Sequence, residues 1–190
     1  VVFASRPERG LEEIVAPGGI AELLPDFRFH ICGYDHTTQE MAAYYRQLWA
    51  RCEELPNVIN HGPLGKADLY RLLASCGACI YPTTFEDTSN ILLLEANAAG
   101  TPFVGPKDHA ALPETGAGGG FLQVPLKDGA VDRQAFADAI RSLCDNEFTW
   151  EDFHRRALSK RQTWASAAEQ WTDEFYRLLR EKSSDKLRLT

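Results

Sequence analysis

The stretch Tyr81-Pro82-Thr83-Thr84-Phe85-Glu86-Asp87-Thr88-Ser89-Asn90-Ile91-Leu92-Leu93-Leu94-Glu95-Ala96 places a strand end, a polar loop and a helix start in direct succession. Pro82 stops the apolar run before it, and Thr88, Ser89 and Asn90 are residue types that cap helices. The apolar segment from Ile91 to Ala99 is therefore expected to be a helix whose first turn opens on the loop. Such a helix end offers unpaired N–H groups and a partial positive charge, which suit a phosphate.

Two carboxylates flank this predicted helix start. Asp87 lies in the loop and Glu95 lies in the second turn. Because a carboxylate repels a bound anion, we expect both side chains to contact hydroxyl groups of a sugar or ribose attached to that phosphate.

The same residues resemble the retaining glycosyltransferases of the GT-B fold (glycosyltransferase group 1). The donor-binding domain of that family carries a Glu-x7-Glu element followed by Ala-x-Ala-x-Gly-x-Pro. Here the pattern reads Asp87-x7-Glu95, followed by Ala96-Asn97-Ala98-Ala99-Gly100-Thr101-Pro102. This sequence departs from the family pattern at two places. Asp87 is one methylene shorter than the usual Glu, and Ser89-Asn90 replaces Phe-Gly.

The resemblance implies a role for each residue of this stretch. Asp87 and Glu95 would be the catalytic pair, with Asp87 on the donor sugar and Glu95 on the ribose. The helix start would surround the diphosphate, which the amides of Asn90 and Ile91 contact. The implied binding residues here are Thr88, Ser89, Asn90, Ile91 and Glu95.

A second phosphate-binding turn is expected near the start of the chain. Val1 to Ala4 is predicted to be a strand, Ser5 to Gly10 a polar turn and Leu11 to Val15 a helix. Such a turn can cradle a phosphate, or it can be an ordinary turn with surface arginines. The resemblance favours the cradle, and implies diphosphate contacts from Ser5, Arg6, Arg9 and Gly10, with Arg9 as the main cation and Arg6 as the second candidate.

Two further strand ends complete the predicted site. Phe27 to Gly33 alternates like a strand and precedes a helix over 37–55, so Gly33 and Tyr34 lie at the edge where open parallel sheets bind ligands. Asn57 to Gly62 is the next predicted strand, and a helix follows from Pro63. The resemblance implies that His61, Gly62 and Leu64 lie beside the nucleotide base, although His61 can also be a loop histidine without a role.

The remaining segments continue the alternation of strands and helices. Repeated βα units predict an α/β fold, a Rossmann-like doubly wound parallel sheet flanked by helices. Because Gly-x-Gly-x-x-Gly and Gly-x4-Gly-Lys-Ser/Thr are missing, a dinucleotide-binding or Walker domain is not expected. We expect a donor-binding domain over 1–180, with closing helices at its end, and a charged, frayed tail over 181–190. The other predicted elements are strands over 102–105 and 121–124, a connection over 108–114, and helices over 132–144 and 150–175.

Composition excludes several classes of protein. The chain has 190 residues, 44% hydrophobic and 25% charged, and no apolar run of the length of a membrane span. A net charge of −7 without a basic stripe argues against nucleic-acid binding. The chain begins in a strand without Met, and resembles half of a GT-B enzyme. We therefore expect a domain fragment whose N-terminal acceptor domain is missing, and which is inactive alone.

The five cysteines predict a reducing compartment, and we expect a cytoplasmic protein. Their number is odd and their spacing is not that of a disulfide scaffold. Cys76-x-x-Cys79 can be a redox dithiol, but the predicted position of Cys76 after a helix and of Cys79 in a strand favours buried, inert thiols.

The leading hypothesis is a donor-binding domain of a retaining glycosyltransferase that uses a nucleotide-diphosphate sugar as donor substrate. We expect no cofactor and no metal, because Asp-x-Asp is absent and an arginine with a helix dipole can neutralise the diphosphate. The alternatives are a non-catalytic GT-B-like module that binds a ligand or a protein, favoured by Ser89-Asn90 in place of Phe-Gly, and a thiol redox protein.

Overall fold

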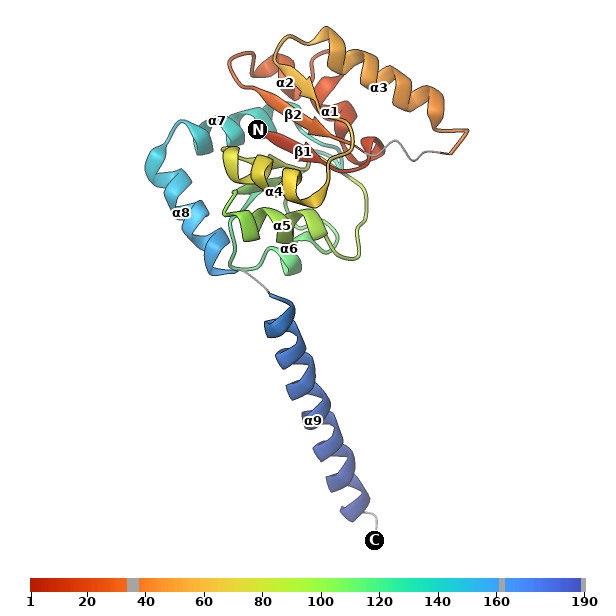
Figure 1. The fold of residues 1–190 in the computed structure, drawn as a ribbon, viewed down its shortest axis with the longest axis vertical. Coiled ribbons are helices and arrows are strands. Elements are labelled where there is room, and N and C mark those ends of the chain that lie inside the picture. Colours follow the sequence, from red (N-terminus) through yellow and green to blue (C-terminus); the bar gives the residue numbers. More distant parts are fainter. Residues whose placement is uncertain (34–37, 161–162, 189–190) are drawn as a thin grey trace. The chain divides into compact units, whose positions relative to one another are not determined.

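The computed structural model of the chain contains one six-stranded sheet, and all of its strand pairs are parallel (Figure 1). The structure describes residues 1–33, 38–160 and 163–188. The strand order β3-β2-β1-β4-β5-β6 is the order of a doubly wound Rossmann fold, so the expected fold class is confirmed. The strands are β1 (Val2–Ala4), β2 (Phe29–Cys32), β3 (Val58–Asn60), β4 (Cys79–Ile80), β5 (Phe103–Pro106) and β6 (Phe121–Val124).

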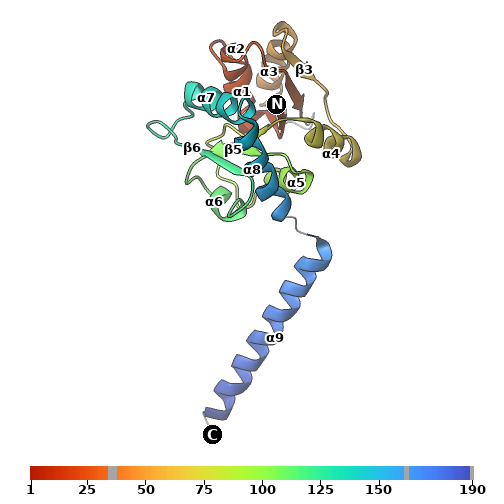
Figure 2. The same cartoon turned by 90° about the vertical axis from the view of Figure 1, so that its left-hand side faces the viewer.

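The strand order reverses between β1 and β4, where Val2 pairs with Cys79. On one face of the sheet, α1, α2, α3 and α7 pack in a group, and on the other face α4, α5 and α8 do so (Figures 1 and 2). The helices of this part of the chain are η1 (Pro7–Arg9), α1 (Leu11–Val15), α2 (Ile20–Leu23), α3 (Ala42–Glu54), α4 (Lys66–Ser75), α5 (Ile91–Ala99), α6 (Leu112–Thr115), α7 (Arg133–Cys144) and α8 (Glu147–Ser159).

The core explains why the strand sequences are continuous apolar runs. A parallel sheet covered by helices is buried on both faces, so successive side chains of a strand both need to be apolar. Phe3, Ile31, Ile80, Phe103 and Val104 are all fully buried. These strands hold the loops at their carboxyl ends in fixed positions.

The helix that follows the central loop begins and ends where the sequence predicts. The side-chain oxygen of Asn90 accepts a hydrogen bond of 2.8 Å from the N–H of Leu93, which makes Asn90 the N-cap of α5. Gly100 ends α5 in the left-handed conformation at φ 76°, which a glycine adopts without strain.

The predicted helical stretch over 150–175 is wrong as a single element. The structure contains α8, which ends at Ser159, and a separate helix, α9 (Trp164–Arg188). The physical reason is a capping interaction, in which the side-chain oxygens of Thr163 and Ser166 each accept a hydrogen bond of 3.0 Å from the other residue's N–H. Helix α9 extends to Arg188, into the segment that was expected to fray.

Other boundaries differ by a few residues. The helix expected over 37–55 begins at Ala42, Thr37 lies outside the described residues, and the helix expected from Pro63 begins at Lys66. Two short helices, α2 and α6, were not predicted, and α6 lies at the end of the connection expected over 108–114. A helix of four residues is too short to give a readable hydrophobic period.

The chain divides into two units, Val1–Lys160 and Arg161–Thr190. The first contains the sheet and the helices up to α8, and the second contains α9. The expected domain boundary at 180 stays a prediction. None of the helices in the described part of the chain is both long and apolar enough to cross a membrane.

Gly10 lets the turn after β1 lie against the loop after β4. Its φ is 117°, and a Cβ at this position would lie 2.3 Å from the carbonyl oxygen of Pro82. A side chain here would therefore force apart the two loops that leave the sheet at its switch point.

We predict that Gly10→Ala lowers the free energy of unfolding by about 2–4 kcal/mol. About 1 kcal/mol comes from the positive φ and about 1–3 kcal/mol from overpacking against a backbone atom. Gly18→Ala is the matched control, because Gly18 has φ 68° and nothing within 4 Å of a Cβ. Urea unfolding of the wild type and both variants checks this prediction, and equal losses in the two variants would contradict it.

Candidate functional site

A cavity of about 450 Å³ lies at the carboxyl ends of β1 and β4, where the strand order reverses. Open α/β sheets bind ligands at such a switch point. The cavity is lined by eight of the residues predicted from the sequence, which are Ser5, Arg6, Arg9, Asp87, Ser89, Asn90, Ile91 and Glu95. The sheet therefore brings together the two turns that the sequence analysis identified separately.

Arg9 is held between two residues of the loop after β4. Its guanidinium donates a hydrogen bond of 2.8 Å from Nη1 to Oδ1 of Asp87, and lies 4.2 Å from the centre of the Phe85 ring. The side chain is 24% exposed. Its Nε atom is buried and has no hydrogen-bond partner among the described residues.

Asp87 is enclosed by protein groups. The Tyr81 hydroxyl donates a hydrogen bond of 2.6 Å to its Oδ2, and Nδ2 of Asn90 donates one of 3.2 Å to the same oxygen. With the ion pair to Arg9, the carboxylate has three partners, and its side chain is only 7% exposed. Burial raises the pKa of the Tyr81 phenol well above its usual range, with a further contribution from its hydrogen bond to Asp87.

The first turn of α5 faces the same cavity. Asn90 caps the N–H of Leu93, while Ile91 and Leu92 line the cavity. The first N–H groups of a helix have no acceptor within the helix and carry a partial positive charge. The site thus combines backbone donors with a cationic side chain.

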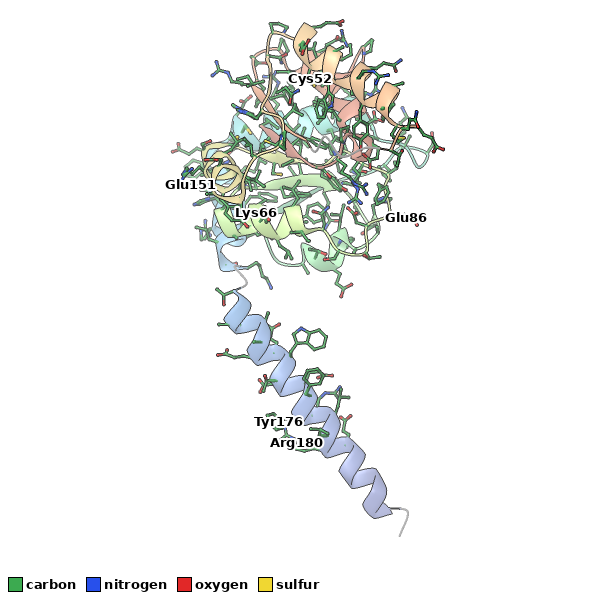
Figure 3. All side chains as sticks on the ribbon, turned by 45° about the vertical axis from the view of Figure 1, so that its right-hand side comes forward. Cys52, Lys66, Glu86, Glu151, Tyr176 and Arg180 are labelled. Atoms are coloured by element: carbon green, nitrogen blue, oxygen red, sulfur yellow. The ribbon has the colours of Figure 1, made fainter. Side chains whose placement is uncertain are left out.

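Glu95 lies where this cavity adjoins a second, smaller one. The smaller cavity has a volume of about 30 Å³, and Gly33, Leu64 and Glu95 are among its lining residues. The Glu95 side chain is 13% exposed, forms an ion pair with Lys66 of α4 and accepts a hydrogen bond of 3.3 Å from the Tyr70 hydroxyl. Figure 3 labels Lys66, which is itself largely exposed.

Among the described residues, Gly10, His61, Gly62 and Thr88 line neither cavity, and the roles of all the predicted site residues stay predictions. Gly10 packs against Pro82, as described above, and Thr88 is exposed. The N–H of Gly62 donates to the side chain of Asn60 at 3.0 Å. The ring of His61 stacks on that of His30, with 2.9 Å between His30 Nδ1 and His61 Nε2. Tyr34 lies outside the described residues.

Sequence reasoning missed Lys66 and Tyr81 as lining residues of the larger cavity. Tyr81 had been assigned only to the strand end, although a hydroxyl there is a usable signal. Lys66 follows Gly65 at a predicted turn, which is a weak signal because exposed lysines are common in such turns. Glu95, the partner of Lys66, is distant in the sequence, and Asp87, the partner of Tyr81, lies across a loop. No local sequence pattern therefore reveals either pair.

The surroundings of Cys76 and Cys79 are unfavourable for a redox pair. Cys76 ends α4 and Cys79 lies in β4, and both are buried. Burial raises the pKa of each thiol, whereas a redox cysteine needs a lowered pKa. Within residues 1–33, 38–160 and 163–188, no group of three or more His, Cys, Asp or Glu side chains is placed to hold a metal ion.

Fold and site together define a Rossmann-like α/β protein whose switch-point cavity is lined by arginines, carboxylates and a helix N-terminus. The family model described as Glycosyl transferases group 1 matches residues 11–146. Since this match covers most of the chain, the protein belongs to that family, as its resemblance implied. No curated protein matches the chain in sequence.

Several solved structures share the fold at low sequence identity. Sucrose-phosphate synthase from Thermosynechococcus elongatus matches with a TM-score of 0.71 and 18% identity, over 95% of this chain and 46% of that one. HepE of Anabaena in complex with UDP matches with a TM-score of 0.69 and 18% identity, over 93% and 48%. A glycosyltransferase from Rickettsia africae matches with a TM-score of 0.68 and 12% identity, over 94% and 47%. The chain thus spans about half the length of these proteins.

We predict that the four buried cysteines of the native protein, Cys32, Cys52, Cys76 and Cys79, resist thiol reagents near pH 8. Burial raises the pKa of Cys32 and of Cys52 to about 12, so almost no reactive thiolate forms at that pH. Titration with a chromogenic disulfide before and after guanidinium unfolding, with mass spectrometry to assign the sites, measures this. Rapid labelling of Cys76 or Cys79 in the native protein would contradict the prediction and restore the redox interpretation.

Proposed function

We propose that the chain is the donor-binding domain of a glycosyltransferase that transfers a sugar, with retention, from a nucleotide-diphosphate sugar to an acceptor. One observation carries this proposal: Arg9, the N-terminus of α5 and Glu95 border a single cavity at the switch point of the sheet. The first two suit a diphosphate, and the third suits the hydroxyl groups of a ribose.

The diphosphate part of the proposal follows from charge. Arg6, Arg9 and Lys66 supply three cations to the cavity, against the two carboxylates of Asp87 and Glu95. A diphosphate between Arg9 and the amides of Ile91 and Leu92 receives charge-assisted hydrogen bonds from both sides. Because these groups neutralise the diphosphate, we propose that no metal is needed for donor binding.

The nucleoside part of the proposal follows from the position of Glu95 between the two cavities. A ribose held by Glu95 directs the base toward the smaller cavity beside Gly33 and Leu64. That cavity is too small for a base, so the surrounding loops have to open around it. The ribose also has to displace Lys66 from Glu95, which frees the ammonium group for the phosphates.

The solved relatives support a nucleotide sugar as the ligand. HepE has been crystallised with UDP and glucose, and with UDP-glucose. Because the chain spans about half of such proteins, we propose that transfer requires an acceptor domain that closes over the donor. Acceptor-dependent release of nucleotide by this chain alone would contradict that requirement. The free thiols support a reducing compartment such as the cytoplasm.

A non-catalytic ligand-binding module is the second candidate. The enclosure of Asp87 by three protein partners favours it, because the carboxylate implied for the donor sugar is already engaged. Both candidates bind a nucleotide at the same cavity, but only the first transfers sugar. Sugar transfer by a protein that joins this domain to an acceptor domain therefore separates the two.

We predict that Arg9→Ala weakens the binding of a nucleoside diphosphate by about 1.5–3 kcal/mol, the contribution of a hydrogen bond to a charged group. Calorimetry of the wild type with UDP, GDP and ADP first identifies the nucleotide that binds, and the variant is then titrated with that nucleotide. Arg155→Ala is the control, because this arginine on α8 is 74% exposed and does not line the cavity. Unchanged affinity in a folded Arg9→Ala variant would move the role to Arg6 or exclude the site.

We predict that Glu95→Gln weakens the binding of a ribonucleotide but not that of its dideoxyribose analogue. The substitution keeps the shape of the side chain and removes the charge that holds two ribose hydroxyls. It also weakens the ion pair with Lys66, but that effect is common to both ligands, so the ratio of the two affinities isolates the ribose contact. An equal change for both ligands, measured by calorimetry, would mean that Glu95 has a structural role.

A further inference from the structure

The carboxylate of Asp87 connects three elements of the fold. It accepts hydrogen bonds from Arg9 after β1, from Tyr81 at the end of β4 and from Asn90 at the start of α5. A carboxylate has two oxygens with about four acceptor positions. Three positions are used and the side chain is 7% exposed, so little of it remains for a ligand.

We propose that Asp87 and Tyr81 are positioning residues that hold Arg9 for the diphosphate, and that Asp87 does not bind the donor sugar. This inference rests on the proposed function and changes the role that the family resemblance implies for Asp87. It also assigns a function to Tyr81, which the sequence analysis placed only at a strand end.

The contacts of Arg9 fit a side chain that is prepared for a ligand. Oδ1 of Asp87 accepts a hydrogen bond from Nη1 of the guanidinium, and the Phe85 ring lies against the planar face of the guanidinium. A guanidinium has five N–H donors, and the buried Nε donor has no protein partner among the described residues. The side chain lines the cavity and is 24% exposed, so a phosphate oxygen in the cavity can accept hydrogen bonds from the donors that Asp87 leaves open.

Tyr81 is suited to fix the position of Asp87. Its side chain is 1% exposed, and its ring lies 6.1 Å from that of Phe103 on the neighbouring strand β5. The hydroxyl is therefore anchored in the sheet, whereas Asp87 belongs to a loop. The hydrogen bond of 2.6 Å between them restrains Asp87 relative to the sheet. The ion pair with Asp87 in turn restrains Arg9.

Paired ligands separate this role from a sugar contact. The affinities of the wild type, Asp87→Ala and Tyr81→Phe are measured by calorimetry for UDP and UDP-glucose, GDP and GDP-mannose, and ADP and ADP-glucose. Tyr81→Phe keeps the buried ring and removes only the hydroxyl. We expect Asp87→Ala to weaken the binding of the diphosphate and of its sugar conjugate by the same factor, roughly tenfold. We expect Tyr81→Phe to weaken the binding of both ligands by a smaller common factor.

Two controls complete the experiment. Glu86→Ala removes an exposed carboxylate from the same loop (Figure 3), and is expected to leave all affinities within twofold of the wild type. In an Arg9→Ala background, Asp87→Ala is expected to have almost no further effect, because it acts through Arg9. Circular dichroism of each variant confirms that the fold is retained, and Tyr81→Phe carries the test if Asp87→Ala does not fold.

Each other outcome overturns the inference. A loss confined to the sugar conjugates would assign Asp87 to the sugar. A gain in affinity for the diphosphates would show that Asp87 competes with the ligand for Arg9. Full additivity with Arg9→Ala would show that the two residues act separately. Absence of nucleotide binding by the wild type would contradict the proposed function itself, and the positioning role with it.

Discussion

The ion pair between Arg9 and Asp87 joins two loops whose residues are 78 positions apart in the sequence. The loops meet because β1 and β4 are neighbours at the reversal of the strand order, and because Gly10 has no side chain to keep them apart. The cavity between the two loops requires both the pairing of β1 with β4 and the absence of a side chain at Gly10. Arg6 and Arg9 come from the turn after β1, whereas the helix N-terminus and both carboxylates come from residues 87–95, and the sheet brings these two segments together.

The two acidic residues of the cavity have different partners. A carboxylate beside an anion is unfavourable unless it is neutralised or faces another part of the ligand. Asp87 is neutralised by Arg9 and enclosed by Tyr81 and Asn90. The ion-pair partner of Glu95 is the largely exposed side chain of Lys66. A ligand that replaces Lys66 therefore has to satisfy the Glu95 carboxylate, because the Glu95 side chain is only 13% exposed. On this basis we propose that Asp87 positions Arg9 and that Glu95 is the carboxylate that contacts a ligand.

Local signals allowed much of the fold to be predicted. The strand that ends at Ala4, the cap at Asn90 and the C-terminal Gly100 each depend on a few adjacent residues, and each lies as expected. The separation of α8 from α9 was missed, since a hydrogen-bonded Thr163–Ser166 pair is a weaker signal than the apolar period on either side. The partners of Asp87 and Glu95 were not predicted, because Arg9 and Lys66 reach them through tertiary contacts. Family resemblance predicted the candidate site, and the contacts of Asp87 are the basis on which we propose another role for its first carboxylate.

The most direct test of the account is to map nucleotide binding residue by residue. Amide chemical shifts of the isotope-labelled chain are followed by NMR while UDP, GDP and ADP are added in turn. We predict that the nucleotide that binds shifts the amides of Ser5 to Gly10 and of Ser89 to Leu92, on the two sides of the switch point, and leaves those of α7 and α8 unchanged. Binding of all three nucleotides elsewhere in the chain, or shifts confined to residues outside these two segments, would contradict the claim that the cavity between β1 and β4 is the donor site.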